Sequence, residues 1–450
     1  MPVFSSLAAF FKRHKRKIIV AASVAISTYF LVNELVIKKF RNFQNSLKQE
    51  LIFKQQIKQR FIQTQQDCYY TILALLPVLT TPVSDYLPTE VITQALKVKK
   101  QPSVSNATAA SSTAASLTQD NLQLLDKADT KLQPYVNMSK AELWQKLKIK
   151  TITRTLTLAY SITALLLLTR LQLNILARRS YLEAAIQMAG VKPSQPPQGD
   201  NQDTYVTEQA YLSLSWWLLN KGWKQIANTI EPLVEARFEA IKPKSELAIG
   251  EFSRLLSEVI DDIPATDMTQ SLFPTAYDDL METLANTNPQ MIDQLDRPDS
   301  GFVKLINETT SIISDNVYCL GLFKSLIHHM LATLQYNLQV NLGEGAMGHS
   351  SLLMSSAEDA PPPLFGNDDK KFKLATFLAQ LSVQSGVMAD NNNIVHQQEL
   401  ENDDQLEGFI ASLAQGQAQD QELTGNIYVN TLNDSEELDD FSAGIYSNFE

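Results

Sequence analysis

An apolar stretch near the amino terminus limits how this chain can fold. Residues 18–37 are apolar apart from a few polar positions and follow directly behind the basic run Lys12-Arg-His-Lys-Arg-Lys17. A helix of this length extends about 30 Å, which matches the hydrocarbon thickness of a bilayer. Glu34 lies near one end of the stretch, where it can reach the interface. The sequence therefore predicts a transmembrane anchor flanked by the basic residues Lys12, Arg13, Lys15, Arg16 and Lys17.

Other interpretations of this stretch fit its residues less well. A signal peptide needs small residues at a cleavage site after its apolar part, and residues 29–34 offer none. A nuclear or nucleic-acid-binding patch needs no adjacent apolar span, so the basic run fits a membrane flank better. A buried core helix stays open as an alternative. Charge does not fix the orientation of the span, because basic residues lie on both sides of it.

Charge is distributed unevenly along the 450 residues, whose formal net charge is -11. Residues 1–60 hold 12 Lys and Arg against 2 Asp and Glu. After Lys373 there is no Lys or Arg, whereas 14 acidic residues follow. We expect the basic end, residues 1–17, to flank the membrane, and residues 414–450 to form an acidic, solvated and disordered tail.

Helical spacing dominates the rest of the chain, and glycine is scarce, with 15 in the whole sequence. From residue 38 onward, apolar residues recur at three- and four-residue steps, which predicts a helix that leaves the membrane and ends at Pro77. Ser139-Lys-Ala-Glu142 matches a capping box and opens a long run without Pro or Gly. These patterns predict an all-α fold, in which a single transmembrane helix precedes an elongated helical bundle over residues 38–413.

Residues 155–169 are the strongest candidate for a second membrane span, since they carry no charge between Arg154 and Arg170. Fifteen residues form only about 22 Å of helix, which is too short to cross the bilayer. We therefore predict a central helix that is buried on all sides.

Shorter segments complete the prediction. Helices are expected over residues 90–99, 246–262, 275–286, 301–341, 370–388 and 397–413, and long loops over residues 101–120, 191–204 and 342–369. Three of the four tryptophans lie within residues 211–223. Such a cluster is expected in the core, with an exposed binding face as the alternative.

The sequence contains no arrangement that indicates catalysis, a cofactor or a metal. Residues 343–348 spell G-x-G-x-x-G, but a helical pattern precedes them and a loop follows, so the dinucleotide-binding context is missing. His328 and His329 are neighbours on a helix and point about 100° apart, which excludes a shared metal. Cys68 and Cys319 are expected to be small buried side chains. We expect neither enzymatic activity nor a nucleic-acid partner.

Several ordered blocks carry a resemblance to a known family. The chain resembles the peroxisomal biogenesis factor 3 (peroxin-3) family, fungal type, most clearly over residues 1–225. The resemblance is carried by Phe10-Phe-Lys-Arg-His-Lys-Arg-Lys17, Phe61-x3-Gln65-x2-Cys68-x2-Thr71, Trp144-x2-Leu147-Lys148, Arg170-x-Gln172-Leu-Asn174 and Tyr211-Leu-Ser213.

The resemblance implies a membrane docking receptor without a cofactor. Its partner would be the cytosolic import receptor and chaperone of peroxisomal membrane proteins, which places an amphipathic helix in a groove. The matching groove residues are Trp144, Leu147 and Lys148 on one helix and Thr93, Leu96 and Lys97 on the preceding one. Lys97 and Lys148 are expected at the rim, where they can pair with acidic residues of the partner.

The resemblance also implies a location and further partners. The protein would lie in the peroxisomal membrane, with residues 1–17 lumenal and the bulk of the chain cytosolic, and in the endoplasmic reticulum during biogenesis. Factors of organelle inheritance or autophagy are additional partners implied by the family. Two alternatives stay open: a membrane-anchored helical tether or scaffold without the groove, and a membrane-bound enzyme, for which no polar constellation is present.

Overall fold

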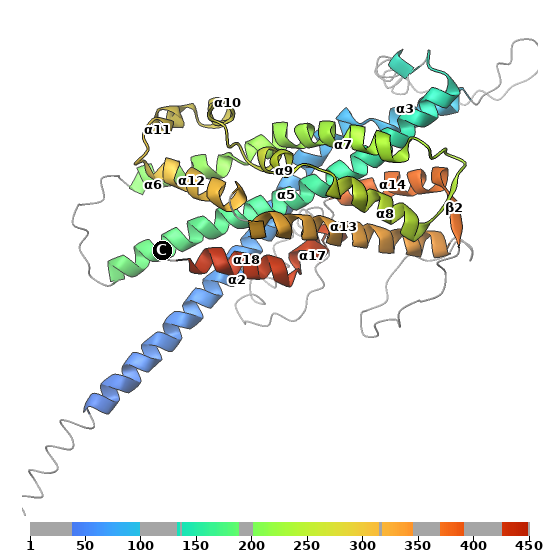
Figure 1. Cartoon of the computed structure of the whole chain (residues 1–450). Coiled ribbons are helices and arrows are strands. Elements are labelled where there is room, and N and C mark those ends of the chain that lie inside the picture. The colour runs from blue at the N-terminus through green and yellow to red at the C-terminus, as the bar shows by residue number, and fades with distance from the viewer. Residues whose placement is uncertain are drawn as a thin grey trace, which may run out of the picture. The chain divides into compact units, whose positions relative to one another are not determined.

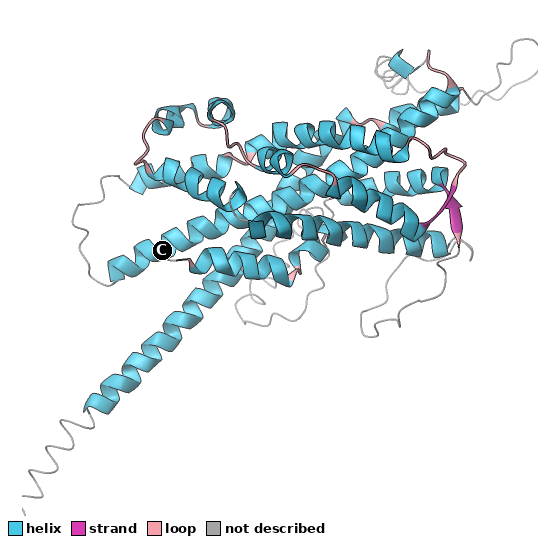
Figure 2. Cartoon of the chain, in the orientation of Figure 1, coloured by secondary structure: helices cyan, strands magenta, loops and turns pink. Residues whose placement is uncertain are grey.

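The computed structural model describes residues 38–99, 133–135, 137–188, 201–314, 317–344, 370–390 and 425–448. The chain divides into two units, Met1–Gln63 and Thr64–Glu450. In the first unit the described residues are helical throughout. The predicted anchor, its flanking basic residues, the loop at 101–120 and the helix at 397–413 lie outside the described residues. The second unit is a helical bundle with one pair of very short strands (Figures 1 and 2). The all-α prediction is therefore confirmed for the described part of the chain.

The first described helix, α2 (Lys38–Tyr86), runs past the point where the sequence predicts its end. Pro77 and Pro82 both lie inside it. A proline within a helix removes one hydrogen bond and costs about 3 kcal/mol. Leu76, Leu79 and Val83 on the same stretch are completely buried, and the burial of each offsets roughly 2 kcal/mol of that loss. The prediction that the helix ends at Pro77 is wrong, because packing outweighs the local signal.

Helix α5 (Lys140–Met188) forms the centre of the second unit. Its capping box is present: the Ser139 amide donates to Glu142 Oε2 at 2.6 Å, and the Glu142 amide donates to Ser139 Oγ at 3.2 Å. Residues 151–172 are all buried, so this part of the helix is covered on every side. Figure 1 shows the surrounding helices laid along it. The prediction of a central buried helix over 155–169 is confirmed.

The other helices between α2 and the carboxyl-terminal region come from most of the remaining chain, and several of them pack directly on α5. In chain order they are α3 (Thr89–Val98), α6 (Asn201–Ser213), the π-helix η2 (Leu218–Gly222), α7 (Trp223–Phe238), α8 (Ile249–Asp261), α9 (Ala265–Leu272), α10 (Tyr277–Thr287), the 3-10 turn η3 (Pro289–Met291), α11 (Ile292–Leu295), α12 (Gly301–Ser314), α13 (Val317–Glu344) and α14 (Leu374–Ala389). The single helix predicted over 301–341 is thus two helices, whose junction at residues 315–316 lies outside the described residues.

Two short strands replace the predicted first turns of two helices. Strand β1 (Glu246–Ala248) pairs antiparallel with β2 (Lys371–Lys373), with Leu247 opposite Phe372. Each strand leads directly into a helix, α8 and α14 respectively. The predicted helix starts at residues 246 and 370 are therefore wrong, because the two segments satisfy their backbone groups against each other.

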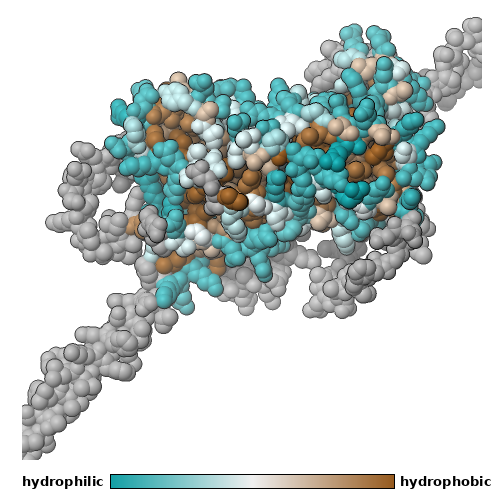
Figure 3. All heavy atoms as spheres, in the orientation of Figure 1, coloured by the Kyte–Doolittle hydropathy of each residue, from teal (hydrophilic) through white to brown (hydrophobic). Residues whose placement is uncertain are grey.

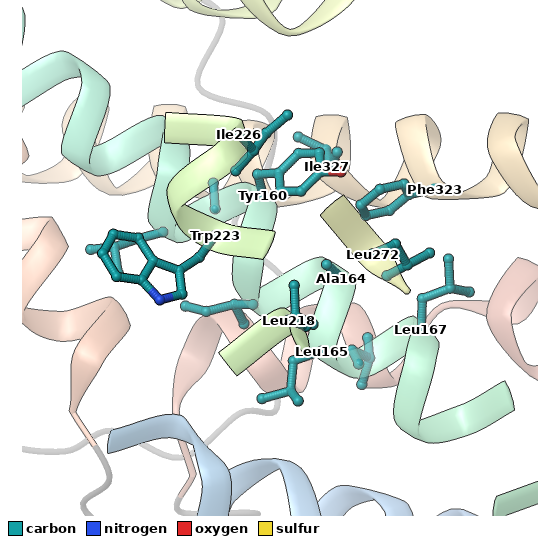
Figure 4. Close-up of a cluster of buried hydrophobic side chains, with 14 of the residues drawn as sticks. Tyr160, Ala164, Leu165, Leu167, Leu218, Trp223, Ile226, Leu272, Phe323 and Ile327 are labelled. Carbon is teal, nitrogen blue, oxygen red and sulfur yellow. The ribbon is translucent and has the colours of Figure 1, made fainter. Parts of the chain in front are cut away.

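The predicted aromatic cluster belongs to the core. Trp217 and Trp223 are buried, and Figure 4 shows Ile226 beside Tyr160 of α5, with Trp223 in the same group of buried side chains. The Tyr160 ring meets Phe323 of α13 edge-on at 5.0 Å between centroids. Gly222, at the end of η2, lies so close to α9 that a Cβ atom there would stand 1.9 Å from the Ser271 carbonyl oxygen. The core interpretation is confirmed for Trp217 and Trp223, whereas Trp216 is half-buried.

Within the described residues, two helical segments are long and apolar enough to cross a bilayer, Lys140–Leu182 and Val317–Gly343. In the first, 94% of the most apolar window is buried by neighbouring helices, as expected of a core helix. In the second the buried share is 44%. That helix, α13, packs its apolar face against α5 and α8.

Hydrophilic residues cover much of the face drawn in Figure 3, with apolar side chains exposed between them.

The acidic carboxyl-terminal region is folded where it is described. Helices α17 (Ile427–Asn433) and α18 (Glu436–Ser447) pack against α5 and α13. Leu438, Phe441 and Ile445 of α18 are buried. The Asn426 side chain accepts hydrogen bonds from the amides of Tyr428 and Val429, which caps α17. The prediction of a disordered tail is wrong for residues 425–448, because an apolar stripe within the acidic sequence has a surface to cover.

Candidate docking site

A small apolar cluster lies between α3 and the first turns of α5, apart from the main core. We call it the α3–α5 cluster; its buried members are Ile92, Ala95, Leu96, Leu143 and Leu147, and its half-buried edge is formed by Tyr135, Met138 and Trp144. Two helices alone supply the buried members, whereas the main core draws on most of the bundle. Only half-buried side chains cover the edge of this cluster, so further apolar side chains can pack against it.

The structure brings together most of the residues that the sequence predicts for a binding groove. Leu96 and Leu147 are members of the α3–α5 cluster, and Trp144 lies half-buried at its edge. Lys97 is exposed beside them on α3. Thr93 is half-buried, and its hydroxyl donates to the Thr89 carbonyl at 2.8 Å, within its own helix.

Lys148 does not lie at an exposed rim, where the resemblance places it. Its side chain is 1% exposed, and Nζ donates to the carbonyl oxygens of Phe238 and Ile241 at 2.5 and 2.9 Å. Burial lowers the pKa of Lys148, while the nearby Glu239 carboxylate acts in the opposite direction. The expected rim placement is wrong: this ammonium group joins α5 to the end of α7.

An ion pair that the sequence did not indicate fixes α3 on α5. Arg154, almost fully buried, places Nη1 2.8 Å from Glu90 Oε1 at the start of α3. Partial burial raises the pKa of Glu90, but the hydrogen bond from Arg154 and its positive charge outweigh this, so the pKa lies below its usual value. The pairing joins positions 64 apart in sequence.

Basic side chains surround the α3–α5 cluster. Lys99 Nζ donates to the Met138 carbonyl, and Lys146 Nζ stands 5.8 Å from the centre of the Tyr135 ring. Both lysines are exposed, as is Lys140 in the first turn of α5. The site therefore combines an apolar strip, three half-buried edge residues and a cationic margin.

The described residues hold no group of three His, Cys, Asp or Glu side chains that could bind a metal ion. His328 instead places Nε2 2.9 Å from Asp261 Oδ1 on α8. The first two residues of the G-x-G-x-x-G match, Gly343 and Glu344, end α13. Residues 345–348 lie outside the described residues.

Comparison with known proteins gives one family along the whole chain. The Peroxin-3 family model matches residues 9–448. Peroxisomal biogenesis factor 3 of Debaryomyces hansenii is 48% identical over the full length of both chains. Peroxisomal membrane protein PEX3 of Komagataella phaffii is 32% identical, with 98% of this chain and 99% of its own covered. Peroxisomal biogenesis factor 3 of Saccharomyces cerevisiae is 26% identical over 97% of this chain.

The family match and the two relatives above 30% identity extend over nearly all of the sequence, including the segments that form the α3–α5 cluster. This chain therefore belongs to the peroxin-3 family, whose role is in peroxisome biogenesis and membrane protein import and is not catalytic.

Proposed function

We propose that this protein is a docking receptor of the peroxisomal membrane. Its partner is the soluble import receptor and chaperone of peroxisomal membrane proteins, which binds through an amphipathic helix laid on the α3–α5 cluster. Docking brings the loaded chaperone to the membrane and so supports membrane protein import and peroxisome biogenesis. Family membership and the name of the Komagataella relative, a peroxisomal membrane protein, support this role.

One observation carries the proposal: the α3–α5 cluster is a separate apolar strip with an incompletely covered edge. Helix-in-groove recognition places apolar side chains of one helix, three and four residues apart, against such a strip. Trp144 and Leu147 lie three residues apart on α5, so their side chains point to the same side of that helix. A partner helix that covers them would remove the half-buried indole of Trp144 from water, as a binding hot spot does.

The margin of the cluster supports an acidic partner. Lys97, Lys99, Lys140 and Lys146 are all exposed near it, whereas Glu142 is engaged in the cap of α5. Surface ion pairs of this kind add about 0–1 kcal/mol each, so the lysines set orientation and rate of association more than affinity. Lys148, buried, is not part of this margin.

The membrane anchor belongs to the same proposal. Residues 18–37 span the membrane, residues 1–17 lie on the lumenal side, and the bulk of the chain is cytosolic. A tag placed before residue 1 would then be protected from added protease on intact organelles, whereas a tag after residue 450 would be digested. Digestion of the amino-terminal tag would reverse the proposed orientation.

The docking site is tested by calorimetric titration of the full chain, in nanodiscs, with the purified import receptor. Trp144→Ala is expected to weaken the complex by about 2 kcal/mol, roughly 30-fold in Kd, because an anchor is lost. Trp216→Ala is the matched control, since Trp216 is also half-buried but lies just before η2. Unchanged affinity for Trp144→Ala, or equal losses for both variants, would remove Trp144 from the binding site.

A further inference from the structure

Five lysines gather around the small sheet. Lys242 and Lys244 lie in the turn that leads from α7 to β1, and Lys370, Lys371 and Lys373 lie on or beside β2. Backbone hydrogen bonds from Leu374 to Ser245 and from Ala375 to Pro243 hold the two segments side by side. We call these five residues the lysine platform. All five are exposed, in a protein whose formal net charge is -11.

The lysine platform is not neutralised by the described part of the chain. Lys370 Nζ stands 5.3 Å from the centre of the Phe372 ring, and none of the five lysines forms an ion pair with another described residue. Glu246 faces Lys373 across the strand pair, yet the two groups do not come within ion-pair distance. Elsewhere the same bundle does pair its surface cations, for example Arg237 with Asp262 at 2.6 Å.

Neither helix stability nor protection of the strand edges explains why five lysines gather around the sheet. Lys373 is the residue that precedes α14, and the first turn of α14 carries no acidic side chain. Cations at a helix amino terminus face the positive end of the helix dipole, which is unfavourable. Lysines on edge strands can prevent association of sheets, but strands of three residues need little protection, and Lys242, Lys244 and Lys370 lie outside the strands. The platform therefore concentrates positive charge at some cost in stability.

The lysine platform is joined to the proposed docking site through one buried side chain. Lys148 follows Leu147 of the α3–α5 cluster, and its ammonium group donates to the carbonyl of Ile241, the residue before Lys242. The α3–α5 cluster and the platform are therefore linked through adjoining residues of α5 and of the turn after α7.

We infer that the lysine platform is a second contact area of the same docking site and receives an acidic segment of the import receptor that adjoins its docking helix. This inference rests on the proposed function. The segment is acidic because a helix amino terminus and five lysines that form no ion pair among the described residues favour clustered carboxylates. The platform consists of exposed side chains around a short strand pair, so it attracts and orients the partner and contributes little to apolar burial.

The test measures association of the import receptor with the full chain in nanodiscs at low and high salt. The variant Lys371→Glu with Lys373→Glu is expected to slow association roughly three- to ten-fold at about 0.05 M salt, and to match the wild type near 0.5 M, where charges are screened. Dissociation should change little. The control Arg297→Glu with Lys304→Glu makes the same change in charge on exposed residues beside α11 and in α12, away from β2 (Figure 1). Equal slowing in both variants, or no slowing in either, overturns the inference.

Two further arms separate other occupants and the proposed function itself. Binding of the wild type to vesicles with phosphatidylserine, lost in the platform variant while receptor association is unchanged, would assign the platform to a membrane and overturn the inference. Loss of the platform effect after Asp and Glu residues 399–407 are changed to amides would assign it to this chain's own acidic stretch and would overturn the inference as well. If Trp144→Ala leaves affinity unchanged but the platform variant slows association, the α3–α5 cluster is not the docking site. The platform is then still a contact area for the import receptor.

Discussion

Arg170 Nη2 on the central helix donates a 2.7 Å hydrogen bond to Asn433 Oδ1, the last residue of α17, across 263 positions of sequence. The same guanidinium group bonds Gln65 of α2 and lies 3.3 Å from Asp439 of α18. Because the Arg170 side chain is 1% exposed, water cannot replace these partners. The acidic carboxyl-terminal region thus supplies polar contacts to a buried cation of the core.

Replacing the half-buried Asn433 should therefore lower the free energy of unfolding. Asn433→Ala removes one acceptor from a buried cation, and we expect a loss of about 1.5–3 kcal/mol in the free energy of unfolding. Urea denaturation followed by circular dichroism measures it. Asn286→Ala is the control, since that exposed side chain bonds only the Glu282 carbonyl of its own helix, and it should stay within about 0.5 kcal/mol of the wild type. Equal effects would contradict a role for the Arg170 contact.

Two glycines should respond in opposite directions to the same substitution. Gly222→Ala places a methyl group 1.9 Å from the Ser271 backbone oxygen, so α9 must move away, and we expect a loss of several kcal/mol. Gly321→Ala, in α13, meets nothing within 4 Å and should stabilise the protein by about 0.5–1 kcal/mol through helix propensity. Thermal unfolding of both variants checks this. A Gly222→Ala protein as stable as the wild type would refute the close approach.

Both cysteines should be inert in the folded protein. Burial raises the pKa of Cys68 and of Cys319 to about 12, so at pH 8 only about one thiol in 10⁴ is ionised. Iodoacetamide should leave both unmodified in the native state and modify both in urea, as read by mass spectrometry of the peptides. Fast labelling of either residue without denaturant would show that its thiol is exposed.

The attachment of α3 should depend on pH through Glu90. Its pKa is lowered in the folded protein, so the stabilisation is present above the unfolded value of about 4.3 and is lost as pH falls through the folded value. Hydrogen exchange of the α3 amides should therefore become faster, relative to its intrinsic rate, below about pH 4.5. In Glu90→Gln this pH response should disappear, with α3 already less protected at pH 7. A response unchanged in that variant would assign it to another group.

Helices that depend on neighbouring residues, through a cap or through regular spacing, can be predicted from the sequence. The capping box at Ser139 and Glu142 sets the start of α5, and the absence of Pro and Gly beyond it predicts the longest core helix. The stripe of Leu438, Phe441 and Ile445 is also present in the sequence, but the surrounding carboxylates favour disorder by composition. Spacing could have identified α18, since these residues recur at three- and four-residue steps.

Contacts between distant segments could not be predicted. Lys148 looks like a surface lysine in sequence, because its acceptors at Phe238 and Ile241 lie about 90 positions away. The strands β1 and β2 exist only because residues 246–248 meet residues 371–373. Trp144 and Leu147 are assigned to a site by resemblance, and the periodicity of α5 alone gives only the side of the helix on which they lie.

The bond between Arg170 and Asn433 has a consequence for synthesis of the protein on the ribosome. At roughly 5–20 residues per second, the 263 positions between them take on the order of 13 to 50 s to translate. During that time the central helix carries a cation whose final acceptors have not yet been made. The bundle therefore cannot reach its folded state until translation is almost complete. A chaperone that covers α5 would be needed for most of this interval. A chain that terminates before residue 425 would lack α17 and α18, and its Arg170 would never gain these acceptors.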